Sequence, residues 1–198
     1  MSMNNYEACA VIHKHRGDAL ITNTMSAMMA ITAVSPSPLN LASVPLMGGA
    51  SCLGLGLAIA QPGRPVMVLD GDSSLLLELG SLAQIADVAP ARFIHFVFNN
   101  RLQFSGVANL DRPGRHVDFC AMALAAGYAS AQKIGTVDAL EQSLPALLDS
   151  DGPHMVELEI IAPEKFTKQT PQIDFPDLQF TRMGAEKAAM MEALGTAR

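Results

Sequence analysis

Residues 66–74 read Val-Met-Val-Leu-Asp-Gly-Asp-Ser-Ser, and this stretch decides the fold class. Its first five residues form a largely apolar run of strand length, and Gly71-Asp72-Ser73-Ser74 is typical of a turn that opens a helix. A helix-length stretch follows from Leu75 to Val88. Strand, turn and helix in immediate succession predict one unit of an α/β protein.

The rest of the chain continues this alternation of strands and helices. The expected strands are 18–23, 93–98 and 155–161, and the expected helices are 24–31, 48–60, 117–126 and 137–148. Because each strand is apolar on both faces, it needs cover on both sides. We therefore expect a three-layer α/β/α fold with a mainly parallel sheet.

The length of 198 residues fits one large domain. We expect the sheet domain to occupy residues 1–162. Beyond it, three prolines are interspersed with three phenylalanines, which favours an extended arm, and a short helix is expected over 184–194. Residues 163–198 are therefore predicted to form a C-terminal arm with a short helix.

The charge balance and the hydropathy exclude several classes of partner and location. Thirteen Lys and Arg against nineteen Asp and Glu give a net charge of −6, so no global positive field exists to hold nucleic acid or an anionic membrane. The longest weakly polar run, residues 46–60, is too short to cross a membrane. Lys14 and Arg16 follow the apolar residues 8–12 rather than precede them, which is the wrong order for a secretory signal. Three widely spaced cysteines without a Cys-x-x-Cys pair are typical of reduced, buried thiols, so we expect a cytoplasmic protein.

The helix expected over 48–60 carries no charge and contains Gly54 and Gly56, which would let it approach another backbone closely. The run Gly54-Leu-Gly-Leu-Ala58 also raises the alternative of a nucleotide-binding Rossmann domain. That motif should follow a strand, and here it does not, while Ile59 takes the place of the third glycine. Close packing is the better explanation of these glycines.

Two polar clusters follow successive predicted strands. Gly71-Asp72-Ser73-Ser74 comes after one strand and Asn99-Asn100 after the next. The carboxyl ends of parallel strands collect ligands, so we expect both clusters to face one crevice. Asp72 offers a carboxylate suited to Mg²⁺ and Asn100 an uncharged oxygen. Taken singly, each cluster also has an ordinary interpretation, as a helix cap or as a turn.

The spacing of 28 residues between Asp72 and Asn100 resembles the signature of thiamine diphosphate enzymes, which begins Gly-Asp-Gly and ends Asn-Asn. The resemblance extends upstream over residues 45–51, through Gly54-Leu-Gly-Leu-Ala58 and Gln61-Pro62, to Leu69-Asp70-Gly71-Asp72. These motifs are similar to the cofactor-binding half of phosphonopyruvate and sulfopyruvate decarboxylases. The resemblance covers residues 18–162 and implies a thiamine diphosphate-binding fold.

The resemblance implies a role for each matching residue. Mg²⁺ would be held by Asp72, Asn100 and the backbone carbonyl of Leu102, all of them oxygen ligands. The diphosphate would be bound by Asn23, Ser26, Ser73 and Ser74. Pro45 and Met47 would face the aminopyrimidine, with Met47 as the apolar wedge behind the bent cofactor, although it could also be an ordinary core methionine. Gly48 and Gly71 complete the cofactor-binding set.

The sequence departs from the family pattern in two ways and lacks one half of the enzyme. Ser73 replaces the second glycine of Gly-Asp-Gly, and Pro45 stands where the family usually has glycine. The family also needs a glutamate from a pyrimidine-binding domain, and none of the eight glutamates here matches it. The resemblance therefore implies a partner chain that carries this domain, in a hetero-oligomer with possible self-association.

The segment after Asn100 is expected to be a polar loop. It contains Arg101, Arg112 and Arg115, which could receive a small anionic 2-oxo acid, although a merely solvated loop is the open alternative. The family has small residues directly after Asn-Asn, so this loop departs from it. Among the histidines, His13 and His15 are expected at the surface, and His95 is expected as a hydrogen-bonded core residue.

The leading hypothesis is the cofactor-binding subunit of a thiamine diphosphate- and Mg²⁺-dependent lyase that decarboxylates a small anionic 2-oxo acid of the sulfopyruvate or phosphonopyruvate type. Two alternatives stay open. One is a non-catalytic interaction subunit with a degenerate site. The other is a carboligase or oxidoreductase half-enzyme of the same family.

Overall fold

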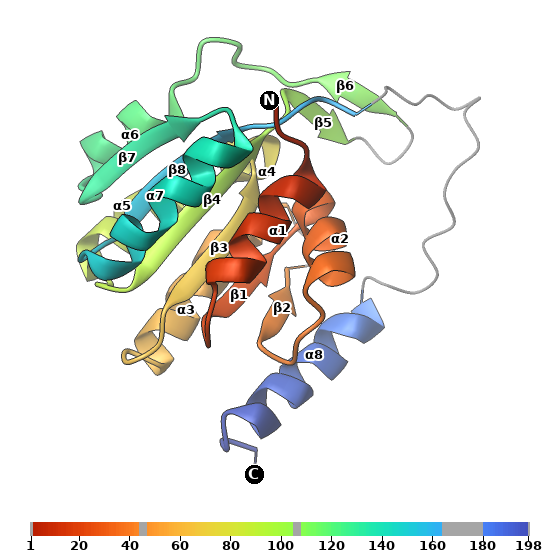
Figure 1. Ribbon diagram of the computed structural model, residues 1–198, viewed down its shortest axis with the longest axis vertical. Helices are drawn as coiled ribbons and strands as arrows, with labels where there is room; N and C mark the ends of the chain where they lie inside the picture. Colours follow the sequence, from red (N-terminus) through yellow and green to blue (C-terminus); the bar gives the residue numbers. More distant parts are fainter. Residues whose placement is uncertain (1, 44–46, 105–107, 164–179, 198) are drawn as a thin grey trace.

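A parallel sheet forms the centre of the molecule. The structure is a computed structural model that describes residues 2–43, 47–104, 108–163 and 180–197. The sheet has six strands, all parallel (Figure 1). In spatial order they are β2 (Asn40–Ala42), β1 (Leu20–Asn23), β3 (Val66–Gly71), β4 (Phe93–Asn99), β8 (His154–Glu159) and β7 (Ser130–Ile134).

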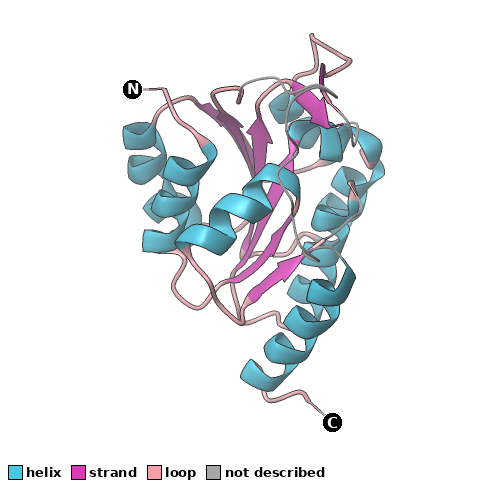
Figure 2. Ribbon diagram, turned by 90° about the vertical axis from the view of Figure 1, so that its right-hand side faces the viewer, coloured by secondary structure: helices cyan, strands magenta, loops and turns pink. Residues whose placement is uncertain are grey.

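Helices cover both faces of this sheet, which confirms the expected three-layer α/β/α architecture (Figures 1 and 2). One layer consists of α1 (Asn5–His15), α2 (Met25–Val34) and α7 (Val137–Asp149). The other consists of α3 (Gly49–Ala60), α4 (Asp72–Leu77), α5 (Gly80–Val88) and α6 (Phe119–Ala126). The last helix, α8 (Phe180–Ala193), packs beside the edge strand β2, where Glu186 Oε2 accepts a hydrogen bond of 2.7 Å from the Ala42 N–H. This contact protects a strand edge that would otherwise expose an unpaired backbone donor.

The strands alternate their side chains between two separate cores. On β3, Val66 and Val68 join the core under α3 to α6, whereas Met67 and Leu69 join the core under α1, α2 and α7. All four side chains are fully buried. This is the pattern of a sheet covered on both faces, and it explains why the predicted strands were apolar throughout.

The structure corrects several expected elements. The helix expected over 75–88 is divided into α4 and α5, because the backbone of Glu78 leaves the helical region with φ −142° and ψ 53°. The expected loop after Asn100 contains an antiparallel hairpin of β5 (Leu102–Phe104) and β6 (Asn109–Asp111). The strands β2 and β7 and the helix α1 were not expected at all.

The C-terminal segment is described only in part. The expected arm over 163–179 lies outside the described residues from 164 onward, and the short helix runs over 180–193 rather than 184–194. Of the two histidines expected at the surface, His13 is exposed, whereas His15 is half-buried beside Glu141. In the described part of the chain, no helix is both long and apolar enough to span a membrane.

Candidate functional site

The sheet has a switch point between β1 and β3. From β1 the chain runs outward to β2 on one side, and it later returns to β3 on the other side before moving on to β4. Ligands of open parallel sheets bind beyond the carboxyl ends of the strands at such a point. Asn23 ends β1, Gly71 ends β3 with Asp72 directly after it, and Asn100 follows β4, so the sequence-predicted polar clusters meet at one edge.

Three oxygen-bearing groups are linked at this edge by a tight turn. The Ser73 hydroxyl donates to the Leu102 carbonyl at 2.9 Å, and the Leu102 N–H donates to Asn100 Oδ1 at 2.9 Å. The Arg101 N–H donates to Asp72 Oδ2 at 3.0 Å. The structure thus brings together the three groups predicted as metal ligands, and a carboxylate, an amide oxygen and a carbonyl form a donor set that suits Mg²⁺.

Asp72 is buried and is paired with an arginine that the sequence had suggested for substrate binding. Arg112 Nε lies 2.6 Å from Asp72 Oδ2, although the Nε–H is not aligned for a hydrogen bond, and both side chains are about 3% exposed. Burial raises the pKa of Asp72, and the Arg112 charge with the N–H groups of Ser73 and Arg101 opposes this shift. Of the other two arginines in the segment, Arg101 and Arg115 are exposed.

The two serines of the turn have partners within the protein. Ser73 holds Leu102, as described above, and Ser74 Oγ accepts a hydrogen bond of 2.8 Å from the Gly48 N–H. Gly48 precedes α3 with φ 92°, and a Cβ at this position would lie 3.1 Å from the Cβ of Glu78. Glycine is therefore required here both by the backbone angle and by the space. Met47 beside it is half-buried, and Pro45 lies outside the described residues.

The diphosphate candidates at the end of β1 include a buried amide whose oxygen is unpaired among the described residues. Asn23 is 2% exposed, and no described residue hydrogen-bonds to its Oδ1. Since rotation of the amide exchanges its oxygen and its NH₂ group, this side chain can offer donors to a phosphate. Ser26 lies nearby in the first turn of α2 and is half-buried. The residues present therefore fit an anionic ligand.

Two of the three non-glycine residues with positive φ in the described part of the chain lie at this edge of the sheet, and the third, Ala89, directly follows α5. Met25 has φ 51° and Arg101 has φ 60°, values that residues with a side chain adopt rarely. One directly precedes Ser26, and the other directly follows Asn100. Strained residues of this kind cluster at functional sites, so this observation supports the same location independently of the motif.

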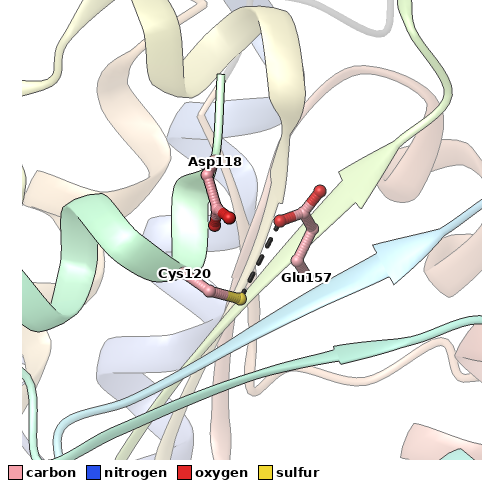
Figure 3. Close-up of side chains that lie close together, drawn as sticks. All are labelled: Asp118, Cys120 and Glu157. Carbon is pink, nitrogen blue, oxygen red and sulfur yellow. Dashed lines mark hydrogen bonds between the residues drawn. The ribbon is translucent and has the colours of Figure 1, made fainter. Parts of the chain in front are cut away.

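A second polar cluster lies under α6 and includes a buried carboxylate that the sequence analysis had not singled out as functional. The side chains of Asp118, Cys120 and Glu157 point toward one another (Figure 3), with ligand atoms within 4.8 Å. Glu157 Oε1 accepts a hydrogen bond of 2.7 Å from Asn99 Nδ2. Lys133 Nζ lies 3.1 Å from Asp118 and 3.7 Å from Glu157 and supplies the compensating charge. The cluster is therefore an ion-pair network that joins the buried Glu157 to the exposed side chains of Asp118 and Lys133.

The histidine expected in the core is found there. His95 is fully buried, with Tyr128 Oη 3.2 Å from Nδ1 and Asp70 Oδ2 3.4 Å from Nε2. Asp70 also accepts a hydrogen bond of 2.8 Å from the Gly71 N–H. This network fixes the start of the turn that carries Asp72.

The environments of the three cysteines predict their order of reactivity. Burial raises the pKa of Cys9 to about 12 and, with the nearby Glu157 charge, that of Cys120 to about 11. At pH 8 fewer than about one in a thousand of these thiols is ionised. We expect iodoacetamide to modify the half-buried Cys52 first and slowly, and the other two only after unfolding in urea. Mass spectrometry of digested protein measures this, and equal labelling of Cys120 and Cys52 in the native chain would contradict it.

Comparison with known proteins shows which family the chain belongs to. The family described as thiamine pyrophosphate enzyme, C-terminal TPP binding domain, matches residues 22–158, which include Asn23, Asp72 and Asn100. Phosphonopyruvate decarboxylase of Streptomyces hygroscopicus is 40% identical over 116 residues, which are 58% of this chain and 28% of that protein. Sulfopyruvate decarboxylase subunit beta of Methanothermobacter thermautotrophicus is 42% identical over 69 residues, which are 35% of this chain and 37% of that subunit.

A solved structure shares the fold. It is that of a protein from Mycobacterium smegmatis assigned to the thiamin diphosphate-dependent enzymes, with a TM-score of 0.69 and 20% identity. The match covers 82% of this chain and 32% of that one. The matched regions also span only 28% to 37% of the length of the two decarboxylase relatives. Most of each of these three proteins therefore lies outside the part that matches this chain.

Proposed function

We propose a function from the premise that this chain belongs to the thiamine pyrophosphate enzymes, in the family of their C-terminal TPP-binding domain. In this proposal the chain is the cofactor-binding subunit of a thiamine diphosphate- and Mg²⁺-dependent lyase. Its substrate is a small anionic 2-oxo acid of the sulfopyruvate or phosphonopyruvate type, because relatives that act as decarboxylases carry these names.

The observation that carries the proposal is the meeting of Asp72, Asn100 and Leu102 beyond the carboxyl ends of β3 and β4, next to the switch point of the sheet. These three residues would hold Mg²⁺, and Asn23, Ser26, Ser73 and Ser74 would bind the diphosphate. Met47 and Gly48 would lie against the aminopyrimidine together with Pro45. When bound, the cofactor supplies a carbon nucleophile and an acceptor for the electrons released with carbon dioxide. The chain itself binds and orients these groups and excludes water from them.

A partner chain is part of the proposal. The family's activating glutamate comes from a pyrimidine-binding domain. Glu157, a buried glutamate of this chain, already accepts a hydrogen bond from Asn99 Nδ2. One set of relatives is named as a beta subunit, which supports a division of the enzyme between two chains. We therefore propose a hetero-oligomer whose active sites lie between this chain and its partner.

The anionic group of the substrate is assigned to the segment after Asn100. Arg101 and Arg115 are exposed and could meet a carboxylate, sulfonate or phosphonate. Arg112 is held against Asp72 and could reach substrate only by leaving that contact.

The experiment that tests this function is affinity purification of the tagged full chain from its native cells with thiamine diphosphate and Mg²⁺ present. We expect a stoichiometric partner, retained cofactor, and release of carbon dioxide when sulfopyruvate or phosphonopyruvate is added. Chelation of Mg²⁺ should remove both the cofactor and the carbon dioxide release. If the complex instead joined two substrates without releasing carbon dioxide, the result would favour a carboligase of the same family.

One observation favours a second candidate function. The Arg112 guanidinium already neutralises the carboxylate that should hold the metal, which is compatible with a non-catalytic interaction subunit. In that case the assembled complex should contain the partner but neither thiamine diphosphate nor Mg²⁺, whatever their concentration in the buffer.

A further inference from the structure

A buried cation occupies one side of the candidate metal site. Arg112 Nε lies 2.6 Å from Asp72 Oδ2, and both side chains are about 3% exposed. The same guanidinium donates through Nη1 to the carbonyls of Pro113 at 3.0 Å and Gly114 at 3.1 Å. Its Cζ lies 5.3 Å from the centroid of the Phe119 ring. Arg112 is thus held in place from three sides.

This position conflicts with a divalent cation on the same carboxylate. Asp72 Oδ2 also accepts the Arg101 N–H at 3.0 Å, so its surroundings are crowded before any metal arrives. Two positive charges at short range in a buried place repel each other strongly, because little water screens them. Removal of either charge favours binding of the other.

We propose that Arg112 is a resident counter-ion of the candidate metal site, which neutralises Asp72 when the site is empty and is displaced from it by a divalent cation. The proposal rests on the proposed function only for the identity of the site. It assigns Arg112 to the metal site rather than to substrate binding. The affinity for the divalent cation then depends on its competition with Arg112 for the Asp72 carboxylate.

The hairpin allows this exchange to be local. The Arg112 N–H donates to the Arg101 carbonyl at 2.9 Å, and the adjacent pair Leu102 and Asp111 begins the β5–β6 ladder. The backbone of Arg112 is therefore fixed by the base of the hairpin. The carbonyl of Leu102 is held by Ser73 independently of Arg112. The arginine side chain can leave Asp72 while the other predicted ligands stay in place.

The test measures cation binding rather than activity. Mn²⁺ is titrated into the complex of the full chain with its co-purified partner, with thiamine diphosphate at a fixed saturating concentration, and free Mn²⁺ is followed by electron paramagnetic resonance. We expect Arg112→Gln to bind Mn²⁺ at least about 10-fold more tightly than the unmodified chain, and Arg112→Lys to stay within about 3-fold of it. Arg92→Gln removes the same charge from an exposed position at the opposite end of β4 and should leave the affinity unchanged.

A second measurement uses the unmodified chain, in case the Gln variant does not fold. The ¹⁵N signal of Arg112 Nε, assigned by its loss in Arg112→Lys, should shift when Mg²⁺ and thiamine diphosphate are added. Unchanged or weaker Mn²⁺ binding by Arg112→Gln, or an unmoved Arg112 signal at saturating Mg²⁺, would overturn the proposal. Absence of cation binding by every variant would overturn the proposed metal site itself and the competition with it.

Discussion

Replacement of Asp72 by Asn should destabilise the chain by about 3 kcal/mol or more, because it leaves Arg112 buried without its counter-ion. Asn keeps the size of the side chain and can still accept the Arg101 N–H, so the effect isolates the charge. The same change removes the one charged ligand of the candidate Mg²⁺ site. Since loss of outer-shell partners alone costs metal sites about 10- to 100-fold in affinity, binding of thiamine diphosphate with Mg²⁺ should weaken by at least about 100-fold.

Urea unfolding measures the first effect, and calorimetric titration of the cofactor at saturating Mg²⁺ measures the second. Asp87→Asn, at an exposed position on α5, is the matched control and should change neither quantity. In the double variant Asp72→Asn with Arg112→Gln, much of the lost stability should return, because the unpaired charge is gone. A stability of Asp72→Asn equal to that of the unmodified chain would contradict the pairing of Asp72 with Arg112.

The sequence was sufficient for the fold class and for the placement of the candidate ligands. Both depend on local patterns: apolar runs of strand length, and polar turns at their carboxyl ends. The topology then brings Asp72 and Asn100 to one edge because parallel neighbours end together. The expected roles of these residues toward a cofactor remain proposals, but their convergence did not require the structure.

The contact between Asp72 and Arg112 could not be predicted from the sequence. The two residues are 40 positions apart, and their meeting depends on a hairpin whose strands have three residues each, too short to show a periodic pattern. Arg112 was consequently grouped with Arg101 and Arg115 as a loop cation. The burial of its side chain and its contact with Asp72 distinguish it from them in the structure.

The missed helix α1 is a different case, since a local signal was present. Asn4 Oδ1 accepts the N–H groups of Tyr6 and Glu7, and Glu7 Oε2 accepts the Asn4 N–H at 2.8 Å. This capping box is visible in the sequence as Asn-x-x-Glu. The edge strand β2 had no such signal, because a strand of three residues is too short to show a periodic hydrophobic pattern.

The glycines of α3 show that composition alone does not identify which glycine permits close packing. They also provide a second test with a large expected effect. Both Gly54 and Gly56 were expected to permit close packing. A Cβ at Gly54 would lie 2.4 Å from Val68 Cγ2 and 3.0 Å from Thr22 Oγ1, whereas a Cβ at Gly56 would meet nothing within 4 Å. Only Gly54 is therefore required for the contact between α3 and the sheet.

The free energy of unfolding of Gly54→Ala should accordingly be lower than that of Gly56→Ala by about 3 kcal/mol, which is in the upper part of the range for overpacking a core. Alanine gains the same helix propensity at both positions, about 1 kcal/mol over glycine, so the difference between the two variants isolates the packing. Val68 cannot easily turn away, because it is fully buried and β-branched, and a shift of Thr22 would disturb its hydrogen bond of 2.9 Å to the Ala50 carbonyl. Urea unfolding of both full-length variants measures the difference. If both alanines stabilised the chain equally, α3 would not lie as close to β1 and β3 as the structure places it. Gly48, which directly precedes α3 beside the candidate site, would then also lie elsewhere.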